Sequence, residues 1–107
     1  MGLQAIDAFK REFGEYLSET FEIMGTEWQR IEELRATYPP SGSFVRVTFI
    51  LNSKGETTIV GVEQTTGKPS VYACLAAIQA RQPYKPWTKE MITLLGHEQT
   101  LTFRFDY

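Results

Sequence analysis

Apolar residues recur every three or four positions through the first third of the chain. This spacing is the period of an amphipathic α-helix and predicts one over residues 3–37, with a break at Gly25-Thr26, where Thr26 can cap a second segment. Tyr38-Pro39-Pro40 ends the helix, because proline lacks a backbone N–H and disfavours helix in the residue before it. The apolar positions are Leu3, Ile6, Phe9, Phe13, Leu17, Phe21, Met24, Trp28, Ile31 and Leu34.

After residue 42 the period changes to two, which is typical of β-strands. The turn sequence Asn52-Ser53-Lys54-Gly55 follows the first strand, and Gly55 can supply a positive φ. Residues 57–65 then form the return strand of a hairpin, with Val60 and Val62 expected on one face. The first strand places Val45, Val47, Phe49 and Leu51 on its core face and Phe44, Arg46, Thr48 and Ile50 on the other.

The second half of the chain predicts two further helices and a last strand. Pro69 suits the first position of a helix over residues 70–81, whose apolar face is marked by Val71, Cys74, Leu75 and Ile78. A short helix follows, with Thr88 as its N-cap and Gly96 as its stop. The final strand carries its apolar residues at Leu101, Phe103, Phe105 and Tyr107.

Together these elements predict one α+β domain over residues 1–107, with an N-terminal helical segment (1–37) and a ββαβ unit (43–107). A hairpin followed by a helical crossover favours a three-stranded antiparallel sheet of order 2-1-3, with the crossover helix on one face. The second and third strands would then be the edges. Phe44, Ile50 and Ile59 point to the other face, and either the N-terminal helix, which we favour, or a second subunit covers them.

Composition narrows the classes of function. The 107 residues carry a net charge of −2 and no basic stripe, so nucleic-acid binding is not expected. No apolar segment is long enough to span a bilayer, and the first residues lack the pattern of a signal peptide. The chain is therefore expected to be cytoplasmic, or a fragment of a protein whose leader or anchor lies outside it.

Catalytic and metal chemistry find little support in the sequence. Cys74, the only cysteine, lies among apolar residues at helical spacing and is expected to be a small core residue. His97, the only histidine, and Glu98 are too few ligands for zinc. The aromatic residues near the prolines are expected either to form a peptide-binding groove or, as we favour, to fill one end of the core. They are Tyr84, Trp87 and Tyr38. The helix glutamates are expected to form a solvated face: Glu12, Glu15, Glu19, Glu22, Glu32 and Glu33.

Several sequence features appear in a familiar order. Tyr16, Leu17, Ile23 and Trp28 lie on the first helix, and Tyr38-Pro39 precedes the strand that runs to the Gly55 turn. Cys74-Leu75-Ala76-Ala77-Ile78 comes before Pro83 and Pro86. Over about residues 16–107 this order resembles the C-terminal domains of TolA and TonB. Three departures stand out: Val45 occupies the position of the first-strand cysteine with which the TolA-type helix cysteine pairs, residues 82–99 are longer than the expected linker, and the membrane anchor is absent.

The resemblance implies a non-catalytic protein-binding domain without a cofactor. It would lie in the periplasm, as part of an inner-membrane-anchored protein, and contact an outer-membrane-linked or periplasmic partner without touching the membrane itself. These families bind by adding a partner strand to an exposed sheet edge, where unpaired N–H and C=O groups are available. The site is then the C-terminal strand, where Thr102, Arg104 and Asp106 would contact the partner's side chains. The residues of this predicted site are Thr100, Leu101, Thr102, Phe103, Arg104 and Phe105.

Energetics limit the expected affinity. A ladder hydrogen bond contributes about 0.5–1.5 kcal/mol, whereas association costs about 4–15 kcal/mol, so binding should be weak, on the order of micromolar. The alternative function is a structural or homodimerising domain that uses the N-terminal helix and the outer sheet face.

Overall fold

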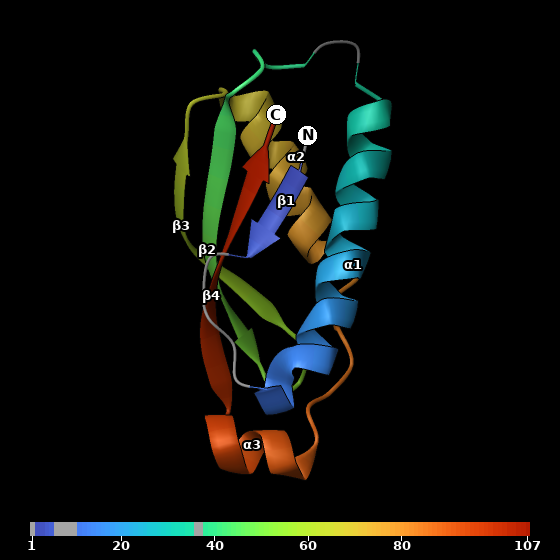
Figure 1. The fold of residues 1–107 in the computed structure, drawn as a ribbon, viewed down its shortest axis with the longest axis vertical. Coiled ribbons are helices and arrows are strands. Elements are labelled where there is room, and N and C mark those ends of the chain that lie inside the picture. The colour runs from blue at the N-terminus through green and yellow to red at the C-terminus, as the bar shows by residue number, and fades with distance from the viewer. Residues whose placement is uncertain (1, 6–10, 36–37) are drawn as a thin grey trace.

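The fold is known from a computed structural model that describes residues 2–5, 11–35 and 38–107. Figure 1 shows long helices beside a twisted sheet, with a short helix at one end of the molecule. The elements in chain order are β1 (Gly2–Ala5), α1 (Arg11–Glu33), β2 (Phe44–Asn52), β3 (Thr57–Gln64), α2 (Lys68–Gln79), α3 (Lys89–Leu95) and β4 (Glu98–Asp106).

The sheet is antiparallel throughout, with strand order β1-β4-β2-β3. The predicted α+β class, the order of the three predicted strands and the antiparallel pairing of the last strand with the first are confirmed. The sheet has a fourth strand, however, because β1 pairs with β4. The prediction that the helix begins at Leu3 is therefore wrong, while Ile6 and Phe9 lie outside the described residues. A single apolar residue, Leu3, cannot distinguish the period of a helix from that of a strand. β1 forms because it pairs with β4 at the other end of the chain.

Helix α1 runs without interruption through Gly25, so the predicted break there is wrong. A glycine inside a helix costs about 1 kcal/mol relative to alanine. Met24 and Trp28 flank this position and are buried almost completely, at 0% and 2% exposure. Burying side chains of this size contributes more than the glycine costs, so packing keeps the helix continuous.

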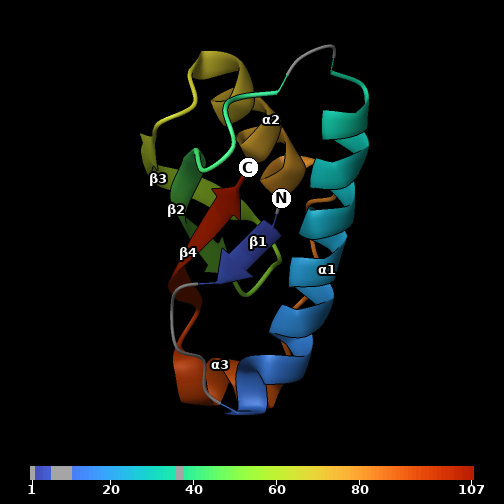
Figure 2. The ribbon, with the colours of Figure 1, turned by 45° about the horizontal axis from the view of Figure 1, so that its top comes forward.

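Both long helices lie on the same face of the sheet (Figures 1 and 2). Phe21 of α1 meets Phe103 of β4 edge-on at a centroid distance of 5.2 Å, and Trp28 meets Phe105 at 5.1 Å. The expectation that α1 covers the outer face is therefore wrong. Helix α2 buries mainly small side chains, Ala73, Cys74 and Ala77, and leaves the aromatic residues of β4 for α1 to cover.

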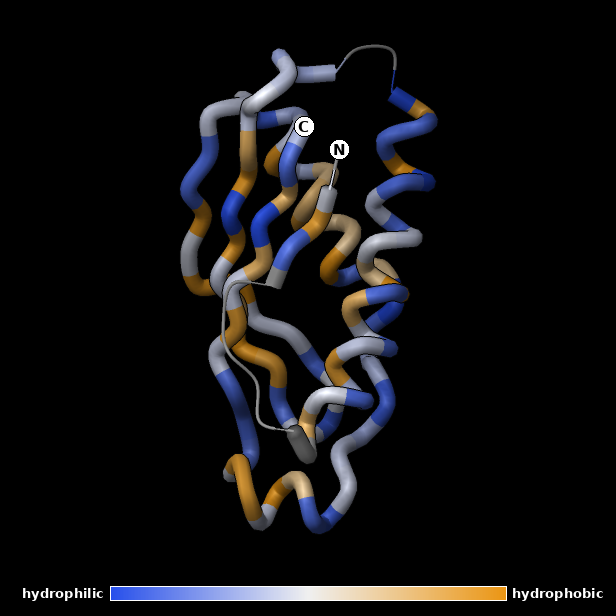
Figure 3. Tube along the Cα trace, viewed as in Figure 1, coloured by the Kyte–Doolittle hydropathy of each residue, from blue (hydrophilic) through white to orange (hydrophobic). Residues whose placement is uncertain are grey.

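Alternation of apolar and polar residues holds along β2 and β4, as the tube in Figure 3 shows, but β3 departs from it. The pairing of β2 with β3 shifts register, so that Thr48 faces Gly61 while Phe49 faces Ile59. The extra residue is Val60, which is 53% exposed. A bulge of this kind moves the residues beyond it to the opposite face. Ile59 therefore packs against the core, contrary to the prediction that it points to the outer face.

Proline-flanked aromatics close one end of the core, as predicted. Tyr84 and Trp87 are buried, and their backbone N–H groups donate to the carbonyls of Gly55 and Ser53 in the β2–β3 turn. Gly55 has the expected positive φ, at 82°. Tyr38 is 53% exposed and takes no part in this plug. The predicted ends of α3 are also confirmed, with Thr88 capping the Met91 N–H and Gly96 at the C-terminus.

Candidate partner-binding site

Strand β4 has a neighbour on each side, but only one of them runs its full length. β2 pairs with it from Glu98 to Asp106. On the opposite side, which we call the outer flank of β4, β1 pairs only from Phe103 to Asp106. The prediction of an open edge is therefore wrong for Phe103, Arg104 and Phe105. Within the described part of the chain, Thr100 and Leu101 have no strand on this flank.

β1 holds its place through Leu3. Leu3 is opposite Phe105 in the strand register and is half-buried against the core. Its Cδ2 lies 3.7 Å from where a Cβ on Gly25 of α1 would be. Figure 1 shows β1 between β4 and α1. The outer flank of β4 therefore offers both a row of backbone groups and a place for an apolar side chain beside α1.

The outward-facing side chains of β4 make contacts within the chain's own sheet. Thr102 shares a hydrogen bond of 3.2 Å with Thr48 of β2. Arg104 Nε donates to Asp106 Oδ1 at 2.7 Å, and Gln4 of β1 donates to Asp106 Oδ2 at 3.1 Å. A partner side chain would therefore have to compete with these contacts in order to bind Arg104 or Asp106.

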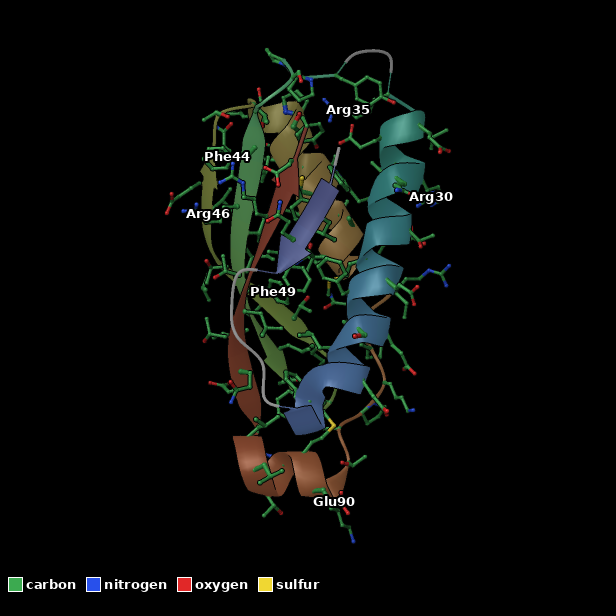
Figure 4. All side chains as sticks on the ribbon, in the orientation of Figure 1. Arg30, Arg35, Phe44, Arg46, Phe49 and Glu90 are labelled. Carbon is green, nitrogen blue, oxygen red and sulfur yellow. The ribbon has the colours of Figure 1, made fainter. Side chains whose placement is uncertain are left out.

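The outer face carries fewer apolar side chains than predicted. Two guanidinium groups lie over the Phe44 ring, that of Arg104 at 4.3 Å and that of Arg46 at 5.6 Å from its centroid. Figure 4 shows Phe44 and Arg46 together on β2. Cation–π contacts of this kind shield an aromatic ring. Since Ile59 lies on the core face, a second subunit is not required to cover this one.

A buried carboxylate lies where α1, α2 and the C-terminal residue meet. Glu32, expected on a solvated face, is fully buried. It accepts a hydrogen bond of 2.6 Å from the Tyr107 hydroxyl and forms an ion pair with Arg35 at 2.9 Å. The Trp28 indole N–H donates to the Tyr107 hydroxyl at 3.2 Å, and Arg35 also donates to Ser70. Glu32 was missed because its spacing matches that of the exposed glutamates. Its partners come from the far end of the sequence.

Cys74 borders this network and is a core residue, as predicted. Its Sγ is fully buried and lies 3.5 Å from the Tyr107 hydroxyl. Burial raises the pKa of the Cys74 thiol to about 12, and burial together with the Glu32 carboxylate raises the pKa of the Tyr107 hydroxyl. A nucleophilic cysteine needs the opposite shift in its pKa. Nothing in this geometry activates the thiol.

The other candidate residues lie apart from one another. His97 is exposed, with Nδ1 3.5 Å from the Ser53 hydroxyl. Among the residues that the structure describes, no group of three or more His, Cys, Asp or Glu side chains is arranged to hold a metal ion. No helix in the described ranges is long and apolar enough to cross a membrane.

Comparison of the chain with known proteins identifies no relative. No family model matches the chain, and no curated protein or solved structure is significantly similar to it. The likeness to the C-terminal domains of TolA and TonB therefore stays a prediction from the residues that carry it.

Proposed function

We propose that this domain is a non-catalytic protein-interaction module that binds a partner by strand addition on the outer flank of β4. The observation that supports the proposal is β1, a four-residue strand that pairs there and places Leu3 beside α1. β1 acts as an internal substitute for the partner strand. By the resemblance, the partner is an outer-membrane-linked or periplasmic protein and the domain belongs to an inner-membrane-anchored chain.

A partner strand must displace β1, and the energetics make this displacement inexpensive. Ordering four residues costs about 4–8 kcal/mol of backbone entropy at about 1–2 kcal/mol each. Burial of Leu3 returns at most about 3 kcal/mol, and each ladder hydrogen bond about 0.5–1.5 kcal/mol. Gain and cost are similar in size. A longer strand that pairs with all of Glu98–Asp106 gains more ladder bonds than β1 does.

The test uses a labelled nine-residue peptide that begins with the β1 sequence Gly-Leu-Gln-Ala and continues Thr-Val-Thr-Val-Thr. In the β1 register it runs antiparallel to β4 and reaches Glu98. We expect a dissociation constant on the order of micromolar. Leu3→Ser should tighten binding by about 3–10-fold. The lost anchor, worth about 1.5–3 kcal/mol, exceeds the small net stability with which β1 docks and competes, so the gain is limited to that net stability. Fluorescence anisotropy measures both values.

Two controls distinguish strand addition from non-specific binding of the peptide. N-methylation of alternate peptide residues removes ladder donors and should abolish binding. Val60→Ser, an apolar-to-serine change on the exposed β3 edge, should leave the affinity unchanged. The proposal fails if the N-methylated peptide binds as well as the parent, or if Leu3→Ser has no effect.

A further inference from the structure

Strand β1 shows which side chains fit the outer flank of β4. Leu3 lies opposite Phe105 and Gln4 opposite Arg104 in the strand register. Consecutive residues of a strand point to opposite faces of the sheet, and Leu3 is half-buried against the core whereas Gln4 is exposed. A partner strand that replaces β1 in this register therefore puts two consecutive side chains into two different surroundings.

The surroundings of Leu3 are apolar and shallow. Gly25 of α1 lies between Phe21 and Trp28, whose rings contact the rings of β4. Because Gly25 has no side chain, Leu3 Cδ2 comes to 3.7 Å from where a Cβ would be. That point is one bond away from the helix backbone, so an aliphatic side chain fills the space, and a ring that reached deeper would overlap with α1. The place of Leu3 therefore favours an aliphatic residue over an aromatic one.

The surroundings of Gln4 include a carboxylate with one oxygen directed to the β1 side. Asp106 Oδ1 accepts from Arg104 Nε at 2.7 Å, and Asp106 Oδ2 accepts from Gln4 Nε2 at 3.1 Å. The Arg104 guanidinium lies 4.3 Å from the centroid of the Phe44 ring on β2, and β2 and β1 lie on opposite sides of β4. The side chain at the place of Gln4 therefore meets the Asp106 oxygen that Arg104 Nε does not use.

The charges around Asp106 favour a neutral donor. Arg104 already neutralises Asp106, and the β2 residue opposite Arg104 is Arg46. A basic partner side chain would add a third cation here, which is unfavourable between neighbouring strands. An acidic side chain would face Asp106 without a hydrogen to donate. A carboxamide donates an N–H without adding charge, so glutamine or asparagine suits this place.

We infer that the partner strand carries an aliphatic residue followed directly by glutamine or asparagine. This inference rests on the proposed strand addition and specifies the partner's chemistry at that site. The aliphatic side chain takes the place of Leu3 beside Gly25, and the carboxamide takes the place of Gln4 and donates to Asp106. β1 is then an internal copy of the recognised residue pair.

The test compares the nine-residue strand-addition peptide, which contains Leu-Gln, with a copy in which glutamate replaces the glutamine. At about pH 7 the glutamate is ionised. The unmodified chain should bind the glutamate peptide about 5–10-fold more weakly, because a carboxylate cannot donate and is repelled by Asp106. Asp106→Asn should bind the two peptides within about twofold of each other, since the new amide can donate to glutamate or accept from glutamine. Fluorescence anisotropy gives the four dissociation constants of this double-mutant cycle.

Glu63→Gln is the matched control. Glu63 is also a carboxylate paired with an arginine, Arg46 at 3.3 Å, but it belongs to β3, at the opposite edge of the sheet from β1. Removing its charge should leave the preference for the glutamine peptide unchanged. A third peptide, with tryptophan in place of the leucine, should bind the unmodified chain about fivefold more weakly or worse, because the ring is too large for the space beside α1.

The possible results distinguish this inference from the strand-addition proposal. If none of the peptides binds, both are wrong. If the glutamine and glutamate peptides bind the unmodified chain equally, strand addition stands and the recognised pair is wrong. A glutamine preference that persists in Asp106→Asn, or that Glu63→Gln also removes, would overturn the role of Asp106. Binding of the tryptophan peptide as tight as that of the parent would overturn the preference for an aliphatic residue.

Discussion

Replacing Gly55 by alanine is expected to destabilise the protein by about 4 kcal/mol or more, a loss that few single substitutions reach. Gly55 has φ of 82°, where a side chain costs about 1–2 kcal/mol. A Cβ there would also lie far inside van der Waals contact with the backbone of Tyr84. That backbone cannot move away easily, because the Tyr84 ring is buried and its hydroxyl donates to the Ile78 carbonyl.

Gly42 provides the matched control for this prediction. Its φ of 89° is similar, but nothing lies within 4 Å of where its Cβ would be. Gly42→Ala should therefore cost only the conformational part, about 1–2 kcal/mol. Urea unfolding followed by tryptophan fluorescence measures both free energies. Equal losses in the two variants would contradict the proposed role of the Gly55–Tyr84 contact.

Arg35→Ala is expected to cost about 3–5 kcal/mol, because it leaves the buried Glu32 carboxylate without its counter-charge. Glu32 is fully buried, and Arg35 is the residue that pairs with it, at 2.9 Å. Figure 4 shows Arg35 near the C-terminal end of α1. The Tyr107 hydroxyl donates to the same carboxylate, but a neutral donor cannot replace the charge.

Arg30→Ala is the control for Arg35→Ala on the same helix. Arg30 pairs with Glu27, yet its side chain is 59% exposed and Glu27 keeps Arg81 as a second partner. The loss should stay below about 1 kcal/mol. Adding Glu32→Gln to Arg35→Ala should recover part of the stability, since no charge then remains to be compensated. Chemical denaturation provides all three values, and a double variant less stable than Arg35→Ala would contradict the explanation.

Local periodicity was enough to predict most elements of this fold. The alternation in β2 and β4, the Gly55 turn and the Thr88 cap each depend on residues close in sequence. The hairpin and crossover then restrict the strand order. β1 could not be predicted in this way, because Gly2–Ala5 is too short to show a period and depends on pairing with β4, about a hundred residues away.

The hydrophobic pattern also could not predict which face of the sheet α1 covers or which of its polar residues are buried. The stripe from Phe13 to Trp28 shows that α1 needs an apolar partner but does not say which side of the sheet provides it. The bulge at Val60 reversed the expected direction of Ile59. Glu32 resembles its exposed neighbours until Tyr107 and Arg35 are placed around it.

For the candidate site, sequence reasoning identified the strand but not its occupant. Within the described residues, Thr100 and Leu101 have no strand on the outer flank, whereas Phe103, Arg104 and Phe105 are paired with β1. The glutamates on α1 were predicted to be exposed, and Glu15, Glu19 and Glu22 are.

Hydrogen exchange of individual amides tests most directly whether β1 is a separable strand on the outer flank of β4. We expect the β1 amides that donate to β4, which alternate along the strand, to exchange at least about 100-fold faster than those of Val47 and Phe49, by a local opening that urea barely affects. Exchange of the β1 amides only through global unfolding, with the protection and urea dependence of Val47, would contradict it. β1 would then be a fixed part of the sheet, with no exchangeable place for a partner strand.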